Sequence, residues 1–307
     1  MAVSEGSELS ALLDRVPLLA GGPRTVEELP GGLTNRNYKV VVPGGAYVVR
    51  VQASDGALLA IDRDAEHASS LAAAAAGVGA PVHAYLPELG VLVVGYLPAR
   101  AFTEADLLDA ANLARVAEAC RRLHAGPRFV RDFDMFEVQR RYLEIVRERG
   151  FRLPARYLDF LPDVERIRKC LAVRAEGTVP CNNDLLPGNI LDDGERLWLI
   201  DYEYAGNNDP CFELGNIWSE SALPPGHLEE LVTAYHGRRL RHKIARARLL
   251  GLMSKYGWTL WAAIQDGAND RIAFDFWSWG MEKYERAVAE FTSRGLAGLL
   301  DEAARDD

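Results

Sequence analysis

The fold of this chain is decided by two stretches, VPCNNDLLPGNIL at residues 179–191 and LWLIDYEY at residues 197–204. In the first stretch Pro187 and Gly188 favour a turn, which lets Asp184 and Asn189 face one site. In the second stretch an apolar strand ends at Asp201. Two carboxylates and an amide offer only oxygen ligands, the type that Mg²⁺ prefers. Each of these residues alone is common in turns, but their joint spacing predicts a magnesium site.

The first third of the chain predicts a small lobe of mixed structure. Turns at residues 30–35 and 43–45 separate runs rich in β-branched residues, and an alanine-rich run has helical propensity. We expect helices at residues 7–19 and 61–76, and strands at residues 37–42, 47–51, 82–86 and 89–96.

Beyond Pro98 the sequence predicts mostly helices, with a β-rich insert at residues 178–204. Residues 209–216 are interpreted as a turn. No flexible linker separates the two parts, so we expect packed lobes, with a cleft between them. The predicted class is α+β: a small β-rich lobe at residues 1–97 and a large helical lobe at residues 98–307. The expected helices lie at residues 104–124, 135–148 and 163–175, and again from residue 227 onward.

Composition excludes several classes of protein. The chain has 307 residues, of which 49% are hydrophobic and 26% are charged, which rules out a disordered chain or a coiled coil. The net charge of −9, without a basic run, argues against nucleic-acid binding. No apolar run is long enough for membrane insertion, and the start does not resemble a signal peptide. The four cysteines form no C-x-x-C pair, which favours reduced thiols in a cytoplasmic protein.

Further motifs lie in both parts of the chain: GGLTN at residues 31–35, LPAR at 97–100, NDPCFELGN at 208–216 and WTLWAAIQ at 258–265. With these motifs and the two stretches above, residues 28–285 resemble the choline/ethanolamine kinases, with the aminoglycoside phosphotransferases as wider relatives. One departure is Asn182, because these kinases usually place His two residues before the catalytic Asp. That His braces the loop by hydrogen bonds, and an amide can also donate and accept. The resemblance implies the two-lobed protein-kinase-like fold with its active site in the cleft.

The resemblance also implies phosphoryl transfer from ATP with Mg²⁺. Asp184 is expected to be the catalytic residue that accepts a hydrogen bond from the acceptor hydroxyl, while Asn189 and Asp201 hold the metal ion. Glycine lets a loop approach phosphates closely, and the always-charged guanidinium of Arg50 suits phosphate contact. The residues expected to bind or position the nucleotide are Gly31, Gly32, Thr34, Asn35, Arg50, Glu66, Tyr96 and Leu97, with Glu66 pairing with Arg50.

An aromatic cluster points to the acceptor. Trp258 and Trp261 are three residues apart, which places them on one face of a helix, although that spacing also suits a core. Tryptophan rings attract quaternary ammonium groups, and a nearby carboxylate adds to the attraction. The resemblance assigns Glu220, Trp258, Trp261 and Trp279 to the acceptor site. Choline is the favoured acceptor. The alternative acceptors are ethanolamine, an amino sugar and an aminoglycoside. An alternative to kinase activity is a catalytically inactive pseudokinase that binds nucleotide. The sequence leaves the oligomeric state open.

Overall fold

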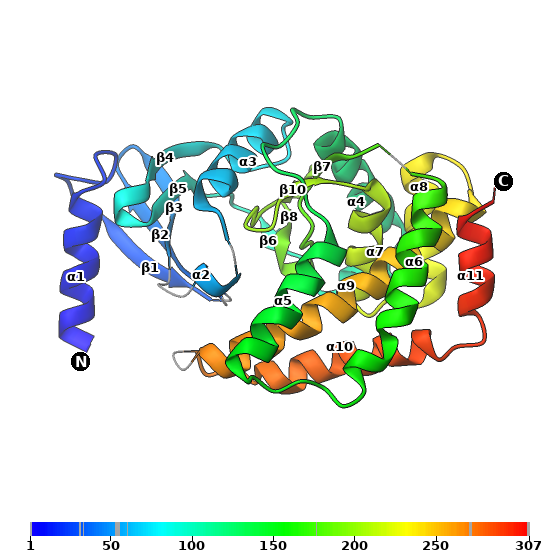
Figure 1. Cartoon of the computed structure of the whole chain (residues 1–307). Coiled ribbons are helices and arrows are strands. Elements are labelled where there is room, and N and C mark those ends of the chain that lie inside the picture. Colours follow the sequence, from blue (N-terminus) through cyan, green and yellow to red (C-terminus); the bar gives the residue numbers. More distant parts are fainter. Residues whose placement is uncertain are drawn as a thin grey trace.

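A five-stranded antiparallel sheet, in the order β1-β2-β3-β5-β4, forms most of the first third of the computed structural model (Figure 1). The structure describes residues 2–30, 32, 34–52, 56–59, 61–175, 177–269 and 272–305. Alternate residues of β2, β3 and β5 face inward and pack against the segment that includes helix α1 (Ala2–Asp14). The strands are β1 (Thr25–Leu29), β2 (Asn35–Val42), β3 (Gly45–Gln52), β4 (Val82–Leu86) and β5 (Val91–Gly95).

Helix α3 (Arg63–Ala75) links this sheet to the rest of the molecule. Asp62 caps its first turn by accepting a hydrogen bond from the backbone of Ala65. Ala73 and the following Val78 belong to the larger hydrophobic core rather than to the small core under the sheet. The backbone of Leu199 also donates to the carbonyl of Val78 at 2.8 Å. Together with the short helix α2 (Gly56–Leu59), α3 therefore lies between the sheet and the helical part, as Figure 1 shows.

The larger part is built around helix α9 (Arg241–Ala268), which packs against helices on several sides. The stretch of α9 from Leu249 to Gln265 is buried, so this stretch has no solvent-facing polar side. The other helices of this part are α4 (Ala110–His124), α5 (Met135–Arg149), α6 (Leu161–Val173), α7 (Pro210–Glu220), α8 (Pro225–His236), α10 (Phe276–Phe291) and α11 (Leu296–Ala303).

Short strands within the larger part carry the loops of the site. One antiparallel pair joins β7 (Val179–Cys181) to β10 (Gly206–Asn208). A second group has the order β6-β8-β9, formed by Arg100–Ala101, Ile190–Asp192 and Leu197–Leu199. The loop of residues 182–189 therefore leaves one small sheet and enters the other.

The predicted class, α+β with a small sheet lobe and a large helical lobe, is confirmed. The strand predicted at residues 82–86 matches β4, and the helix predicted at 104–124 is broken at Asp109, whose side chain caps α4. The first helix ends at Asp14 instead of residue 19. The turn predicted at residues 209–216 is wrong: Asp209 caps α7 and Pro210 occupies its first turn.

Two further expectations concern membranes and thiols. In the described ranges, every helix is too short or too polar to span a bilayer. The four cysteines are free, and burial raises the pKa of the Cys120 and Cys181 thiols well above the ordinary value.

Candidate active site

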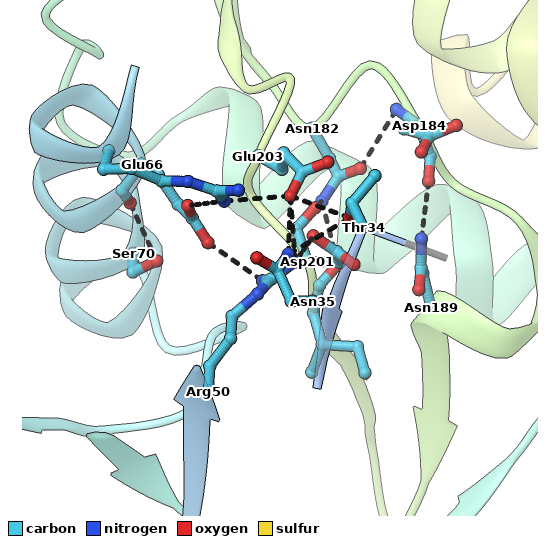
Figure 2. Close-up of polar contacts among 12 residues, drawn as sticks. Thr34, Asn35, Arg50, Glu66, Ser70, Asn182, Asp184, Asn189, Asp201 and Glu203 are labelled. Atoms are coloured by element: carbon cyan, nitrogen blue, oxygen red, sulfur yellow. Dashed lines mark hydrogen bonds and ion pairs between the residues drawn. The ribbon is translucent and has the colours of Figure 1, made fainter. Parts of the chain in front are cut away.

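The loop that carries Asp184 is closed by its own polar side chains. A 3₁₀ turn at Pro187–Asn189 brings Asn189 back, and its amide donates to the carbonyl oxygen of Asp184 at 2.8 Å (Figure 2). The backbone of Asn189 donates to the carbonyl of Leu186 at 2.9 Å. The structure thus brings Asp184 and Asn189 together, as the turn at Pro187 predicts.

Asn182 ties this loop to the segment that carries Asp201. Its side chain is fully buried, and its amide donates to the carbonyl oxygens of Ile200 at 3.0 Å and Asp201 at 2.9 Å. Its carbonyl oxygen accepts the backbone N–H of Asp184 at 3.1 Å. An amide at this position therefore braces the loop, as expected. Asp201 itself has a φ of +64°, a left-handed conformation that is uncommon for aspartate and is typical of functional sites.

Glu213, which the sequence reasoning missed, anchors the start of the loop that carries Asp184. This fully buried carboxylate on α7 accepts the backbone N–H groups of Asn182 at 2.8 Å and Asn183 at 2.7 Å. His124 and Cys181 lie beside it, with one potential ligand atom of each residue within 4.8 Å of the others. Because both oxygens of Glu213 already hold backbone amides, this cluster serves to position the loop.

Arg50 lies at the centre of a charge network between the two lobes. It pairs with Glu66 at 2.9 Å, as predicted, and also with Asp201 at 2.7 Å and Glu203 at 3.3 Å (Figure 2). Burial acts to lower the pKa of Arg50, but the charges of Asp201, Glu66 and Glu203 outweigh it and raise the pKa. The guanidinium is therefore a permanent cation beside Asp201.

Glu203 joins the loop before β2 to this network. Its buried carboxylate accepts Thr34 Oγ1 at 3.0 Å and Asn35 Nδ2 at 2.7 Å, and it pairs with Arg63 at 2.9 Å. The two side chains expected to donate to phosphates are thus directed at Glu203 in this structure. Glu203 follows Asp201 by two residues, a spacing that could have drawn attention to it.

The glycines of this loop were expected to approach phosphate. Gly31 lies outside the described residues. At Gly32 an added Cβ would lie 2.1 Å from the carbonyl oxygen of Asn35, so the loop requires glycine there.

A pocket of about 350 Å³ lies between the sheet and the larger part of the chain. Arg50, Asp201, Tyr96 and Leu97 line it, together with apolar side chains that include Leu29, Val48, Ala80, Leu92, Val94, Leu191 and Leu199. A pocket with apolar walls and a few charged groups suits a planar base attached to a charged group.

The side chains assigned to the acceptor form a continuous series. Trp261 donates to the hydroxyl of Tyr204 at 2.7 Å, and the Tyr204 ring lies 4.9 Å from the ring of Trp258. Trp261 also meets Trp279, with ring centroids 5.6 Å apart. At the other end, Glu220 pairs with Lys283. Sequence reasoning missed Tyr204 and Lys283. Lys283 follows Trp279 by four residues on α10, a helical spacing that could have revealed it.

Asp184 lies close enough to Glu220 and Lys283 for their charges to shift its pKa. Burial, and then the charges of Glu220 and Asp201, raise the pKa of Asp184 well above the ordinary value, while Lys283 acts in the opposite direction. A carboxyl group with a raised pKa is a better proton acceptor than an ordinary aspartate.

The donor chemistry near Asp184 fits a magnesium ion. The amide of Asn189 and the partly exposed carboxylate of Asp201 offer hard oxygen ligands next to the pocket. Mg²⁺ binds proteins through few such groups and keeps waters or phosphate oxygens in its other positions.

Comparisons with known proteins agree with this geometry. Residues 25–250 match the phosphotransferase enzyme family. A choline/ethanolamine kinase family protein from Mesorhizobium loti is 31% identical, with a TM-score of 0.85, and the match covers 97% of this chain and 99% of that one. Protein LicA of Haemophilus influenzae is 27% identical over 77% of this chain and 72% of its own length. The choline kinase LicA of Streptococcus pneumoniae shares the fold, with 23% identity and a TM-score of 0.77 over 95% of this chain and 99% of that one.

A β-rich lobe and a helical lobe that enclose such a loop and pocket define a small-molecule kinase of the protein-kinase-like fold. The chain belongs to the phosphotransferase enzyme family and, within it, to the choline/ethanolamine kinase family.

Proposed function

We propose that this protein is an ATP- and Mg²⁺-dependent kinase that phosphorylates the hydroxyl group of a small amino alcohol, with choline as the first candidate. The observation that carries the proposal is the position of Asp184. This residue lies on a loop braced against Asp201, which lines the pocket. Glu220, one of the side chains assigned to the acceptor, lies close enough for its charge to raise the pKa of Asp184. Choline also fits the relatives, one of which is a choline kinase.

In this proposal residues 1–97 form the nucleotide-binding lobe, and residues 98–307 carry the catalytic loop and the acceptor site. The base of ATP lies against Tyr96 and Leu97, and its phosphates extend toward Arg50. Glu66 holds Arg50 in place. Gly32 shapes the loop before β2, while Thr34 and Asn35 fix that loop to Glu203.

The chemistry is mainly one of positioning. The transition state of phosphoryl transfer is loose, so orientation and charge neutralisation dominate. Asp184 accepts a hydrogen bond from the acceptor hydroxyl, directs its oxygen at the phosphate and takes the proton. Asn189 and Asp201 would hold Mg²⁺, which would neutralise the charge on the phosphate oxygens.

The acceptor lies against Trp258, Trp261 and Trp279, close to Glu220. Indole rings attract a quaternary ammonium group through their faces. One observation favours a second candidate, ethanolamine. Oxygen Oε1 of Glu220 is buried and has no hydrogen-bond partner among the described residues. A primary ammonium group can donate to that oxygen, whereas the trimethylammonium group of choline cannot.

An ADP-release assay with ATP and Mg²⁺ tests the proposal across choline, ethanolamine, amino sugars and aminoglycosides. We expect the highest kcat/KM for choline. A higher value for an amino sugar or an aminoglycoside would contradict the amino-alcohol assignment. No turnover across the panel, with nucleotide binding intact by calorimetry, would favour a pseudokinase.

A further inference from the structure

Lys283 is a buried cation within the series of acceptor-site side chains. It lies on α10 and is only 2% exposed, and its ammonium group donates to Oε2 of Glu220. The same ammonium lies 3.9 Å from the ring centroid of Trp279. Lysine is almost never buried without a partner, and here it has both a carboxylate and an indole face.

These two partners are the groups that the proposed site offers to a cationic acceptor. Glu220 lies next to the catalytic loop because of its place on α7, on which Asn216 precedes it by one turn. The side chain of Asn216 accepts the backbone N–H of Leu185 at 2.9 Å. Glu220 and Lys283 both affect the pKa of Asp184, with opposite signs. The ion pair therefore lies within the electrostatic reach of the catalytic carboxylate.

We propose that Lys283 is a specificity-determining residue whose ammonium group occupies the cation position between Glu220 and Trp279, so that the cationic group of an acceptor competes with it. This inference rests on the proposed function. The built-in ammonium neutralises the carboxylate and covers the indole ring. A positively charged acceptor consequently gains less from the site than it would from a free carboxylate and a free ring.

Two polar atoms of the acceptor-site series have no partner with Lys283 in place. Oε1 of Glu220 and Nε1 of Trp258 are buried, and neither has a hydrogen-bond partner in the described part of the chain. The carboxylate oxygen can accept a hydrogen bond and the indole N–H can donate one, so each can pair with a polar group of a ligand. Lys283 thus lowers the preference for cationic acceptors and leaves these two polar atoms unpaired.

The chain contains a matched control for this residue. Lys255 on α9 is also buried; it pairs with Glu290 at 2.5 Å and lies 4.2 Å from the ring centroid of Trp218. Glu290 also pairs with Arg248 at 3.1 Å, so its charge stays compensated when Lys255 is removed. Neither Lys255 nor Glu290 is among the charges that shift the pKa of Asp184 most.

The test compares choline with dimethylbutanol, its neutral isostere, in which a carbon atom replaces the quaternary nitrogen. Calorimetry with a non-hydrolysable ATP analogue gives Kd for each ligand without turnover. For Lys283→Met we expect the Kd of choline to fall about tenfold, with that of dimethylbutanol changed less than about threefold and the KM for ATP unchanged. In Lys255→Met the ratio of the two Kd values should stay as in the wild type.

A ratio that is unchanged or reversed in Lys283→Met overturns the proposal. If that variant does not fold, the double variant Glu220→Gln/Lys283→Met replaces the ion pair by neutral groups of similar size. We expect it to bind choline and dimethylbutanol within about threefold of each other. A wild-type preference for choline in the double variant would show that the cation binds elsewhere.

The two proposals fail in different ways. Phosphorylation of choline by the wild type, combined with an unchanged ratio in the variants, refutes only the role of Lys283. Failure of the wild type to bind or phosphorylate any amino alcohol refutes the proposed function, and the inference about Lys283 with it.

Discussion

Asp201 shows how far single residues could be interpreted from the sequence. Its place at the end of an apolar strand predicted a carboxylate next to Asn189, and the structure brings the two segments together, because the backbone N–H of Ile200 donates to the carbonyl oxygen of Asn189 at 3.0 Å. Its positive φ and its pairing with Arg50 were not predictable, because both depend on how the two lobes pack.

Replacement of Asp201 tests the metal site. We expect Asp201→Ala to abolish Mg²⁺-dependent turnover, because one of two proposed protein ligands is lost and Arg50 loses a partner. Titration of Mg²⁺ in the ADP-release assay measures this effect. The control is Asp159→Ala, which removes an exposed carboxylate outside the proposed metal site. A Mg²⁺ dependence in Asp201→Ala equal to that of the wild type would place the metal site elsewhere.

Trp261 tests the acceptor site. Its ring meets Trp279 and its Nε1 donates to Tyr204, so its loss opens the centre of the aromatic series. We expect Trp261→Ala to raise the KM for choline at least tenfold and to leave the KM for ATP within about twofold, since cation–π contacts are worth about 1–2 kcal/mol. Trp277→Ala on α10 is the control. Equal rises in both KM values would make Trp261 a core residue.

At the scale of elements, the predictions succeeded where a segment has a pattern of its own. Strand β4 alternates and is bounded by turn residues, and the alanine-rich run of α3 has strong helical propensity. Helix α7 was missed because ten of its residues are buried, so it lacks an amphipathic pattern. Asp209 and Pro210 were interpreted as a turn, although they are also typical of a helix start.

The contact between α7 and α9 supports the loop through Glu213 and Asn216. It depends on two glycines: a Cβ at Gly215 would lie 2.1 Å from the carbonyl oxygen of Ala247, and one at Gly251 would lie 2.6 Å from that of Gly215. Both neighbouring atoms belong to the backbone, so no side-chain movement relieves the contact.

We therefore expect Gly215→Ala to lower the free energy of unfolding by about 1–3 kcal/mol or more, as overpacking does. Gly226→Ala on α8 is the matched control. An added Cβ there meets nothing within 4 Å, and alanine is expected to change the free energy of unfolding by less than about 1 kcal/mol. Urea denaturation of both variants measures the difference, and a Gly215→Ala variant as stable as the wild type would contradict the described helix contact.

At the scale of the whole molecule, the lobes are joined by charge as well as by apolar packing. The sequence predicted the pair of Arg50 with Glu66, which follows from a strand and the next helix. The contacts of Glu203 with Thr34, Asn35 and Arg63 were beyond prediction, because they join residues as many as 169 positions apart and depend on the packing of the lobes.

Removal of the charge of Glu203 tests this connection. Its buried carboxylate forms ion pairs with Arg50 and Arg63. We therefore expect Glu203→Gln to lower the free energy of unfolding by about 2–4 kcal/mol and to raise the KM for ATP. Thermal unfolding and steady-state kinetics measure both effects. Glu28→Gln, which breaks an exposed pair with Arg36, should change stability by less than about 1 kcal/mol. Equal effects of the two variants would remove Glu203 from the connection between the lobes.

The central claim is that Asp184 directs the hydroxyl of a small amino alcohol at ATP. Phosphorus NMR of reactions with choline, ATP and Mg²⁺ tests it most directly, with wild type and Asp184→Ala compared at equal nucleotide occupancy. We predict a phosphomonoester signal that grows in step with ADP in the wild type, and a rate at least about a hundredfold lower in Asp184→Ala. Free phosphate in place of a phosphomonoester, or a variant within a few-fold of the wild-type rate, would contradict the claim.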